Sequence, residues 1–167
     1  REAMRSVGAD VWVLTETFRD FAPSLEHRLI ASSADAPDRN VDEGECWVAI
    51  WSRQPAEILP LTADLDRVAA VVVDEVTIVG TVLPWLSDDR RKNIRGKDAF
   101  CTALAEQAAD WRRLRDCSQR VLCVAGDFNQ DLLTQGHYYG SHEGRQALRK
   151  TLAEMGLHCV TGGRNDP

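Results

Sequence analysis

The sequence lacks any apolar run long enough to cross a bilayer as a helix, which argues against a membrane-spanning protein. No apolar segment follows a basic start, so we expect no signal peptide at its beginning. Internal repeats and low-complexity stretches are also missing. With 167 residues, 44% hydrophobic and 28% charged, the chain has the size of one globular domain with a real core. Because it begins with Arg1 rather than methionine, we expect residues 1–167 to be a piece of a longer protein.

The cysteines form no Cys-x-x-Cys pair, and their number, five, is odd. A zinc site or a disulfide framework is therefore not expected. Cys46, Cys101 and Cys123 lie inside apolar patterns, and we expect them to be small core residues. This cysteine usage favours a reducing compartment, so we expect a cytoplasmic protein.

Positive charge is in deficit, because 20 Lys and Arg face 26 Asp and Glu and leave a net charge of −6. The deficit argues against broad electrostatic binding of nucleic acid. It leaves room for a local basic groove, to which the charged loop 87–97 could contribute.

Apolar patterning predicts strands and helices in mixed order. Strands are expected over 10–16, 27–32, 46–53, 56–61, 67–73, 75–85 and 119–129, with another beginning at 158–163. Helices are expected over 1–8, over 98–116 with Asp98 as its cap, and over 141–157. Because the middle of the chain is all strand, with a hairpin at Asp74 and Glu75, we expect two sheets packed together with helices outside. The runs 11–14 and 121–125 are apolar on both faces, so we expect both strands to be buried on both sides.

Polar side chains stand where several of these strands end. The first strand ends in Glu16, and "VLCVAGDFNQ" (121–130) delivers Asp127 and Asn129. Residues two apart in a strand face the same side, so Asp127 and Asn129 are expected to point into one pocket. Two carboxylates and an amide suit Mg²⁺, which takes one or two protein carboxylates and keeps phosphate oxygens and waters as other ligands. The alternative is plain turn chemistry, since Gly-Asp-x-Asn often only ends a strand.

Two segments, "LTETF" (14–18) and "VAGDFNQ" (124–130), resemble the endonuclease/exonuclease/phosphatase superfamily, whose members are exonuclease III-like and DNase I-like. The resemblance implies an α+β fold, a four-layer α/β/β/α sandwich. It also implies a hydrolase that uses Mg²⁺ or Mn²⁺ to promote in-line attack of water on a phosphoester. In this comparison Glu16 matches the metal-binding glutamate, Asp127 the aspartate that orients or activates the water, and Asn129 the asparagine that steadies the phosphate.

The sequence departs from the family pattern in three places. A first strand ending in Trp-Asn and a closing Asp-His pair are not found, so we expect this chain to lack the first and last segments of the fold and to be nearly inactive alone. On the central hairpin, Val82 stands where many members carry His or Tyr, and Trp85 stands where they carry Asn. This substitution argues against a standard repair endonuclease.

Substrate contacts are expected from Arg19, Arg90, Arg91 and His137, with a solvated loop as the alternative for the arginines at 90 and 91 and a self-packed loop for His137. The function expected is a nuclease, phosphodiesterase or phosphatase. Two alternatives remain: a catalytically degenerate member acting as a binding scaffold, and a generic α/β binding domain. The sequence does not choose among nucleic acid, lipid, inositol and nucleotide substrates, and it leaves the oligomeric state open.

Overall fold

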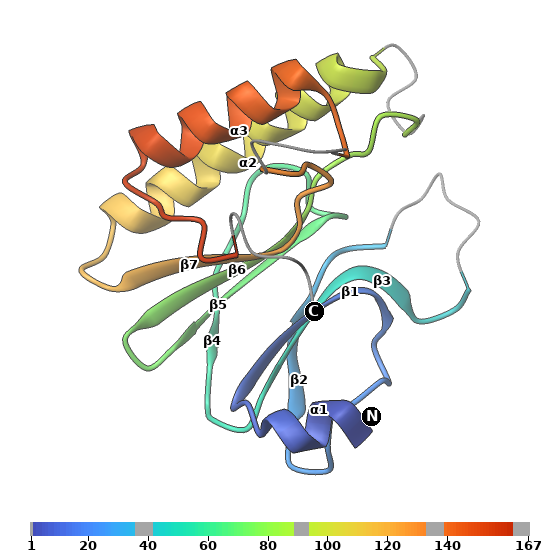
Figure 1. Cartoon of the computed structure of the whole chain (residues 1–167). Helices are drawn as coiled ribbons and strands as arrows, with labels where there is room; N and C mark the ends of the chain where they lie inside the picture. Colours follow the sequence, from blue (N-terminus) through green and yellow to red (C-terminus); the bar gives the residue numbers. More distant parts are fainter. Residues whose placement is uncertain (1, 36–41, 89–93, 133–138, 162–167) are drawn as a thin grey trace. The chain divides into compact units, whose positions relative to one another are not determined.

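A computed structural model describes residues 2–35, 42–88, 94–132 and 139–161 (Figure 1). The elements in chain order are α1 (Glu2–Val7), β1 (Val11–Phe18), β2 (Arg28–Ser32), β3 (Glu45–Ser52), β4 (Glu57–Ile58), β5 (Val68–Val73), β6 (Val76–Val82), α2 (Gly96–Asp116), β7 (Val121–Asp127) and α3 (His142–Glu154). The chain forms two compact units: unit 1 comprises Arg1–Val82 and Ala109–Asp127, and unit 2 comprises Leu83–Ala108 and Phe128–Pro167. Within the described ranges, no helix has the length and hydropathy that a membrane crossing requires.

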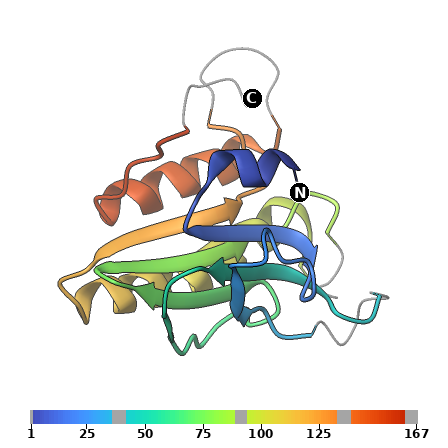
Figure 2. The same cartoon turned by 90° about the horizontal axis from the view of Figure 1, so that it is seen from below.

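Unit 1 contains two sheets that pack face to face (Figure 2). One has the strand order β1-β3-β2 and the other β4-β5-β6-β7. The sheets approach closely at Gly80 on β6, where an added Cβ would collide with Val48 and stand 3.1 Å from Cγ1 of Val13. The predicted hairpin is confirmed, because Val73 pairs with Val76 and Asp74 takes a left-handed φ of 50° in the two-residue turn.

The strands β1 and β7 are less buried than the sequence predicts. Their apolar runs were expected to be covered on both faces, yet Val121 is 66% exposed, Cys123 is exposed, and residues 11–14 are half-buried. Both strands lie at sheet edges: over the described residues, β1 pairs only with β3 and β7 only with β6. The expectation of a buried Cys123 is therefore wrong, whereas Cys46 is buried as predicted.

Helix α2 is fastened to the 60–63 segment by Asp110, which is only 3% exposed. Its carboxylate accepts hydrogen bonds from the Thr62 N–H at 2.7 Å, the Thr62 hydroxyl at 2.9 Å and the Ala63 N–H at 3.1 Å. Arg113 donates to the same carboxylate and to the Pro60 carbonyl. The helix begins at Gly96, so Asp98 lies in its first turn and is not the cap that the sequence suggested. Trp111 is fully buried, as predicted for a core residue.

Unit 2 contains α3 and the first part of α2. Ser141 caps α3, accepting from the Gly144 N–H at 2.9 Å, and Gly156 follows the helix end with a φ of 63°. Lys97 near the start of α2 donates to Glu143 near the start of α3 at 2.9 Å. The strand expected from residue 158 is not found over His158–Thr161, which have no regular structure.

Candidate active site

Glu16 stands in β1 in a conformation that strands do not normally contain. Its φ is 49°, in the left-handed region, although Thr15 still pairs with Val48 and Thr17 with Cys46. For a residue with a side chain this conformation costs about 1–2 kcal/mol, and such strain gathers at functional sites. Glu16 is exposed, while Thr17 beside it is buried. The strained backbone therefore presents a carboxylate to solvent near the end of β1.

Asp127 is the last residue of β7, and the glycine before it has no room for a side chain. β7 runs parallel to β6, with Gly126 opposite Thr81 and Asp127 opposite Val82. A Cβ on Gly126, whose φ is 142°, would collide with the Thr81 carbonyl. The glycine of Gly-Asp-Phe-Asn therefore allows close approach to β6 and fixes where the half-buried Asp127 leaves the sheet.

One contact between the sheets relates the positions of Glu16 and Asp127 along their strands in unit 1. Val13 of β1 lies against Gly80 of β6, and Gly80 pairs with Ala125 of β7. β1 contacts β6 and β7, and β1 and β7 run in the same direction in Figures 1 and 2. From this shared layer Glu16 is three residues further along β1, and Asp127 is two residues further along β7. At about 3.3 Å per residue, the backbone of each residue lies roughly 7–10 Å further along its strand than this layer.

Asn129 belongs to unit 2 and is fixed by a different element. The strand ends at Asp127, so the alternation that was expected to align Asp127 with Asn129 does not reach residue 129. Asn129 has a left-handed φ of 46°, and its Nδ2 donates to the Leu83 carbonyl at 2.9 Å. The hydrogen bond ties Asn129 to the segment that follows β6.

The carboxylates of Glu16 and Asp127 supply hard oxygen donors of the kind that Mg²⁺ and Mn²⁺ prefer, and Mg²⁺ requires no more than one or two of them from protein. Among the residues that the structure describes, no group of three or more His, Cys, Asp or Glu could hold a metal ion. The donor set fits a hydrated magnesium ion better than zinc, which takes nitrogen and sulfur ligands.

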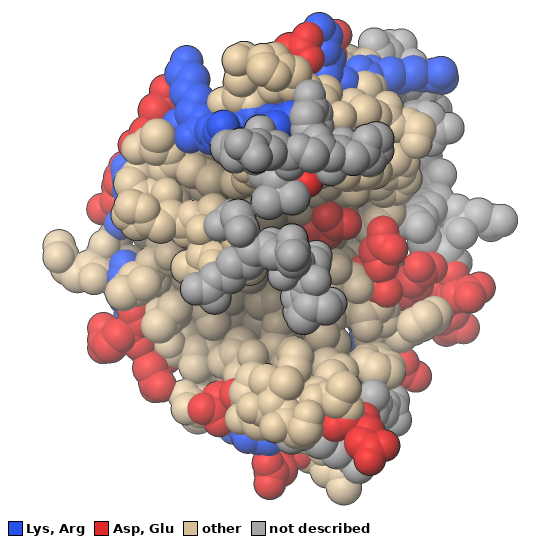
Figure 3. All heavy atoms as spheres, viewed as in Figure 1, with Lys and Arg blue, Asp and Glu red and all other residues tan. Residues whose placement is uncertain are grey.

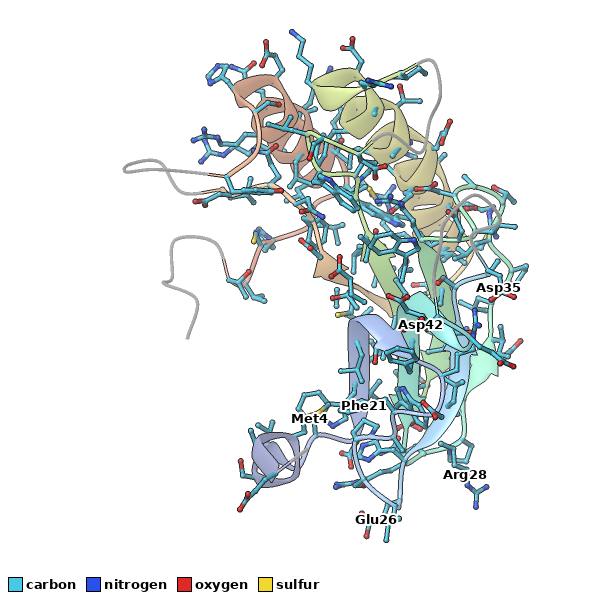
Figure 4. The ribbon with its side chains drawn as sticks, turned by 90° about the vertical axis from the view of Figure 1, so that its right-hand side faces the viewer. Met4, Phe21, Glu26, Arg28, Asp35 and Asp42 are labelled. Atoms are coloured by element: carbon cyan, nitrogen blue, oxygen red, sulfur yellow. The ribbon has the colours of Figure 1, made fainter. Side chains whose placement is uncertain are left out.

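Arg19 binds the end of β2 and the segment that follows it through its guanidinium. It donates to the Ser32 hydroxyl at 2.9 Å and to the Ser33 carbonyl at 2.8 Å, and it forms an ion pair with Asp35 at 2.7 Å. Figure 4 labels Asp35 beyond the end of β2. A phosphate contact by Arg19 stays a prediction.

The other expected substrate contacts, Arg90, Arg91 and His137, lie outside the described residues. Lys and Arg side chains gather over α2 and α3 in Figure 3. On α3 they include the exposed Arg149 and Lys150. Each of these has an oxygen partner, the Leu132 carbonyl for Arg149 and Glu154 for Lys150.

The position to which the resemblance assigns His or Tyr is occupied by a buried apolar residue in this chain. Val82 is fully buried and pairs with Asp127, so it offers no polar group. Trp85 is half-buried, and its carbonyl accepts from the Asp88 N–H at 3.1 Å.

Sequence reasoning missed two partners of the motif, the Leu83 carbonyl and the side chain of Gln130. A backbone carbonyl leaves no trace in sequence. The sequence shows Gln130 directly after Asn129. Gly140 and Gly144, which lie beside the Gln130 side chain in the structure, are the residues that could have pointed to its role.

The fold is shared with solved structures of nucleases and phosphatases. No protein-family model matches the chain, and no curated protein matches it significantly. Similarity to solved structures is clear, however, and it confirms the fold class predicted from the sequence.

Three such structures show this likeness. An AP endonuclease from Archaeoglobus fulgidus has a TM-score of 0.66 and 14% identity, over 92% of this chain and 63% of that one. The 3′ phosphatase NExo from Neisseria, bound to product DNA hairpin, gives 0.62 and 16%, over 91% and 64%. The 3′-5′ exonuclease NExo from Neisseria meningitidis gives 0.58 and 19%, over 86% and 60%. The chain thus spans less than two thirds of the length of each.

Proposed function

We propose that this chain carries part of the active site of a phosphoester hydrolase that depends on Mg²⁺ or Mn²⁺. The observation that carries the proposal is the strained left-handed conformation of Glu16 near the end of β1, a strand that contacts β7, which ends in Asp127. A structural carboxylate gains nothing from such strain, whereas a metal ligand gains a fixed orientation.

The residues divide the work between them. Glu16 would hold the metal ion, which when bound supplies Lewis-acid polarisation of a phosphoryl oxygen. Asp127 would orient the attacking water and accept its proton. Asn129, held through its Nδ2 by the Leu83 carbonyl, would steady the phosphate. Together these roles describe in-line attack of water on a phosphoester.

The substrate class that we propose first is a DNA phosphoester. The support comes from the fold neighbours, one described as an AP endonuclease, one as a 3′ phosphatase bound to DNA and one as a 3′-5′ exonuclease. The net charge of −6 and the buried Val82 argue against a substrate specificity identical to that of those enzymes. All five cysteines are free, so we also propose a reducing, cytoplasmic setting.

The second candidate is a scaffold that keeps the fold and binds a phosphorylated ligand without hydrolysing it. Val82 and Trp85 favour it, because they replace polar groups that the resemblance would supply. Since the neighbours are longer than this chain, we further propose that residues 1–167 alone hydrolyse phosphoesters very slowly.

A metal-binding experiment tests the site without requiring turnover. Mn²⁺ broadens NMR signals of nearby nuclei, so titration with Mn²⁺ should broaden the amides of Thr15, Thr17 and Gly126 before others. The double variant Glu16→Gln, Asp127→Asn should lose this selective broadening, while Glu26→Gln, which changes an exposed carboxylate of the same unit, should keep it. If the double variant kept the same selective broadening, the proposed metal site would be refuted.

Hydrolysis is then assayed on the longest natural chain that contains this sequence. The panel is DNA with a 3′ phosphate, DNA with an abasic site, and a phosphoester lacking nucleic acid, each with Mg²⁺ or with chelator. Chelator-sensitive hydrolysis of DNA supports the first proposal. Metal binding with no turnover of any substrate supports the scaffold.

A further inference from the structure

Gln130, the residue after Asn129, closes the base of the loop that precedes α3. Its Nε2 donates to the Tyr139 carbonyl at 3.2 Å and to the Ser141 carbonyl at 3.0 Å. Its Oε1 accepts from the Ser141 N–H at 3.2 Å. One side-chain amide thus binds three backbone groups that lie nine to eleven residues away.

Two glycines make the space for this amide. A Cβ on Gly140 would collide with the Gln130 side chain. A Cβ on Gly144, in the first turn of α3, would stand 2.5 Å from Gln130 Oε1 and 2.9 Å from Ser141 Oγ. Gly144 is buried and helical, a position where alanine is ordinarily preferred, so its small size is explained by the amide beside it.

Asn129 is therefore held from two directions. Its own side chain donates to the Leu83 carbonyl, and the next residue in the chain is fastened to the start of α3. The Asp131 N–H adds a bond to the Tyr139 carbonyl at 3.1 Å, which closes the loop base a second time. Because both flanks of Asn129 are held, its left-handed conformation (φ 46°) can relax only if one of these hydrogen bonds breaks.

We propose that Gln130 is a positioning residue of the hydrolytic site: by locking the loop base it keeps Asn129 in the left-handed conformation in which its amide meets Leu83. The proposal rests on the role given above to Asn129 in the proposed function. Gln130 itself would touch neither metal nor phosphate.

NMR on the chain separates this role from a merely structural one. Gln130→Met keeps the side-chain length and removes the donors and the acceptor. We expect exchange of the Ser141 amide with solvent to accelerate about tenfold or more, and the side-chain NH₂ signals of Asn129 to shift and lose protection. Gln130→Glu keeps the acceptor, so it should retain part of the Ser141 protection and still release Asn129. Gln146→Met is the matched control, because Gln146 is exposed on α3 and its Nε2 is hydrogen-bonded to His142 of the same helix.

Gly144→Ala tests the same contact by placing a methyl group against the Gln130 amide. At an ordinary helical position the change raises the melting temperature by about 2–4 °C for a chain of this size. Here it should lower the melting temperature and change the Asn129 signals as Gln130→Met does. If Gln130→Met does not fold, Gly144→Ala still gives the decisive reading.

The outcomes keep the two proposals apart. Unchanged Asn129 signals in folded Gln130→Met or Gly144→Ala would overturn the positioning role, whatever the activity. On a hydrolytically active longer chain, Gln130→Met should lower kcat/KM about tenfold or more without changing the Mg²⁺ dependence. Release of Asn129 with unaltered kcat/KM would overturn the link to the reaction. If the parent hydrolyses nothing, the proposed function fails, and the NMR result still decides what holds Asn129.

Discussion

The Gly126 backbone lies directly against the Thr81 carbonyl, so no side chain fits between β7 and β6 at this point. We expect Gly126→Ala to destabilise the fold by about 2–4 kcal/mol, because the neighbouring atom is backbone and cannot swing away. Urea denaturation at neutral pH measures the change.

Gly8→Ala is the control for this variant. Gly8 also has a positive φ, 66°, but a Cβ there meets nothing within 4 Å. The loss of stability in Gly8→Ala should therefore come from backbone conformation alone and amount to about 1 kcal/mol. Equal losses at the two positions would contradict the steric account of Gly126.

The division of roles between Glu16 and Asp127 predicts different metal behaviour. Asp127→Asn removes the group that orients the water and should slow hydrolysis by about 10²–10⁴-fold at any Mg²⁺ concentration. Glu16→Gln should weaken metal binding instead, so excess Mg²⁺ should restore part of its rate. Rates against Mg²⁺ concentration, on the longest active chain, distinguish them. Identical metal curves for both variants would refute this division.

Relief of backbone strain should stabilise the chain at the expense of the site. Glu16→Gly removes the left-handed penalty at φ 49°, so we expect a stability change between none and a gain of about 1 kcal/mol, together with loss of selective Mn²⁺ broadening. Asp74→Gly is the matched control, with φ 50° in the β5–β6 turn. It should change stability similarly and leave Mn²⁺ binding intact. A clear loss of stability in Glu16→Gly alone would mean that this carboxylate supports the fold.

Asp110 should make the chain sensitive to acid. Burial by itself raises the pKa of this carboxyl, but hydrogen bonds from Thr62, Arg113 and Ala63 outweigh burial and hold the pKa below its ordinary value of 3.8. A lowered pKa in the folded chain stabilises it above pH 3.8, and this contribution is lost as the pH falls below that value through the folded pKa.

Asp110→Asn should cost about 1–3 kcal/mol at pH 7 and less near pH 3, where the parent has also lost part of the contribution. Melting temperatures at the two pH values measure it. Asp116→Asn is the control, because Asp116 is exposed and pairs with Arg115 on the surface. A loss at Asp110 that does not change with pH would indicate packing rather than charge.

Much of the fold follows from local patterns. Turn residues at Asp74 and Glu75 and the helical stripe around Trp111 predicted their elements correctly, because the signal lies within a few residues. The burial of β7 was wrong for a physical reason. An apolar run such as 121–125 forms a strand wherever it pairs, and its exposure depends on how many strands flank it, which is not a property of the run.

The site residues, too, could be chosen from local sequence patterns, whereas their contacts with residues distant in the chain could not be predicted. Glu16 and Asp127 were chosen from strand ends and from the resemblance. The proposal that they act together depends on the Val13–Gly80 contact, between residues 67 positions apart in the chain. The hydrogen-bond partner of Asn129 is Leu83, 46 positions away, and Gln130 binds Ser141, 11 positions away. None of these partners is marked by residue type, so only the folded chain reveals them.

Among the described residues β7 pairs on one side only, and this has a consequence for residues 1–167 in solution. A strand edge with unclaimed ladder positions is a template on which a second chain can pair, and natural edges are commonly guarded by lysine or proline. The sequence of β7, VLCVAGD, contains neither, and its first valine is mostly exposed. We therefore expect this chain to aggregate through concentration-dependent self-association before it unfolds.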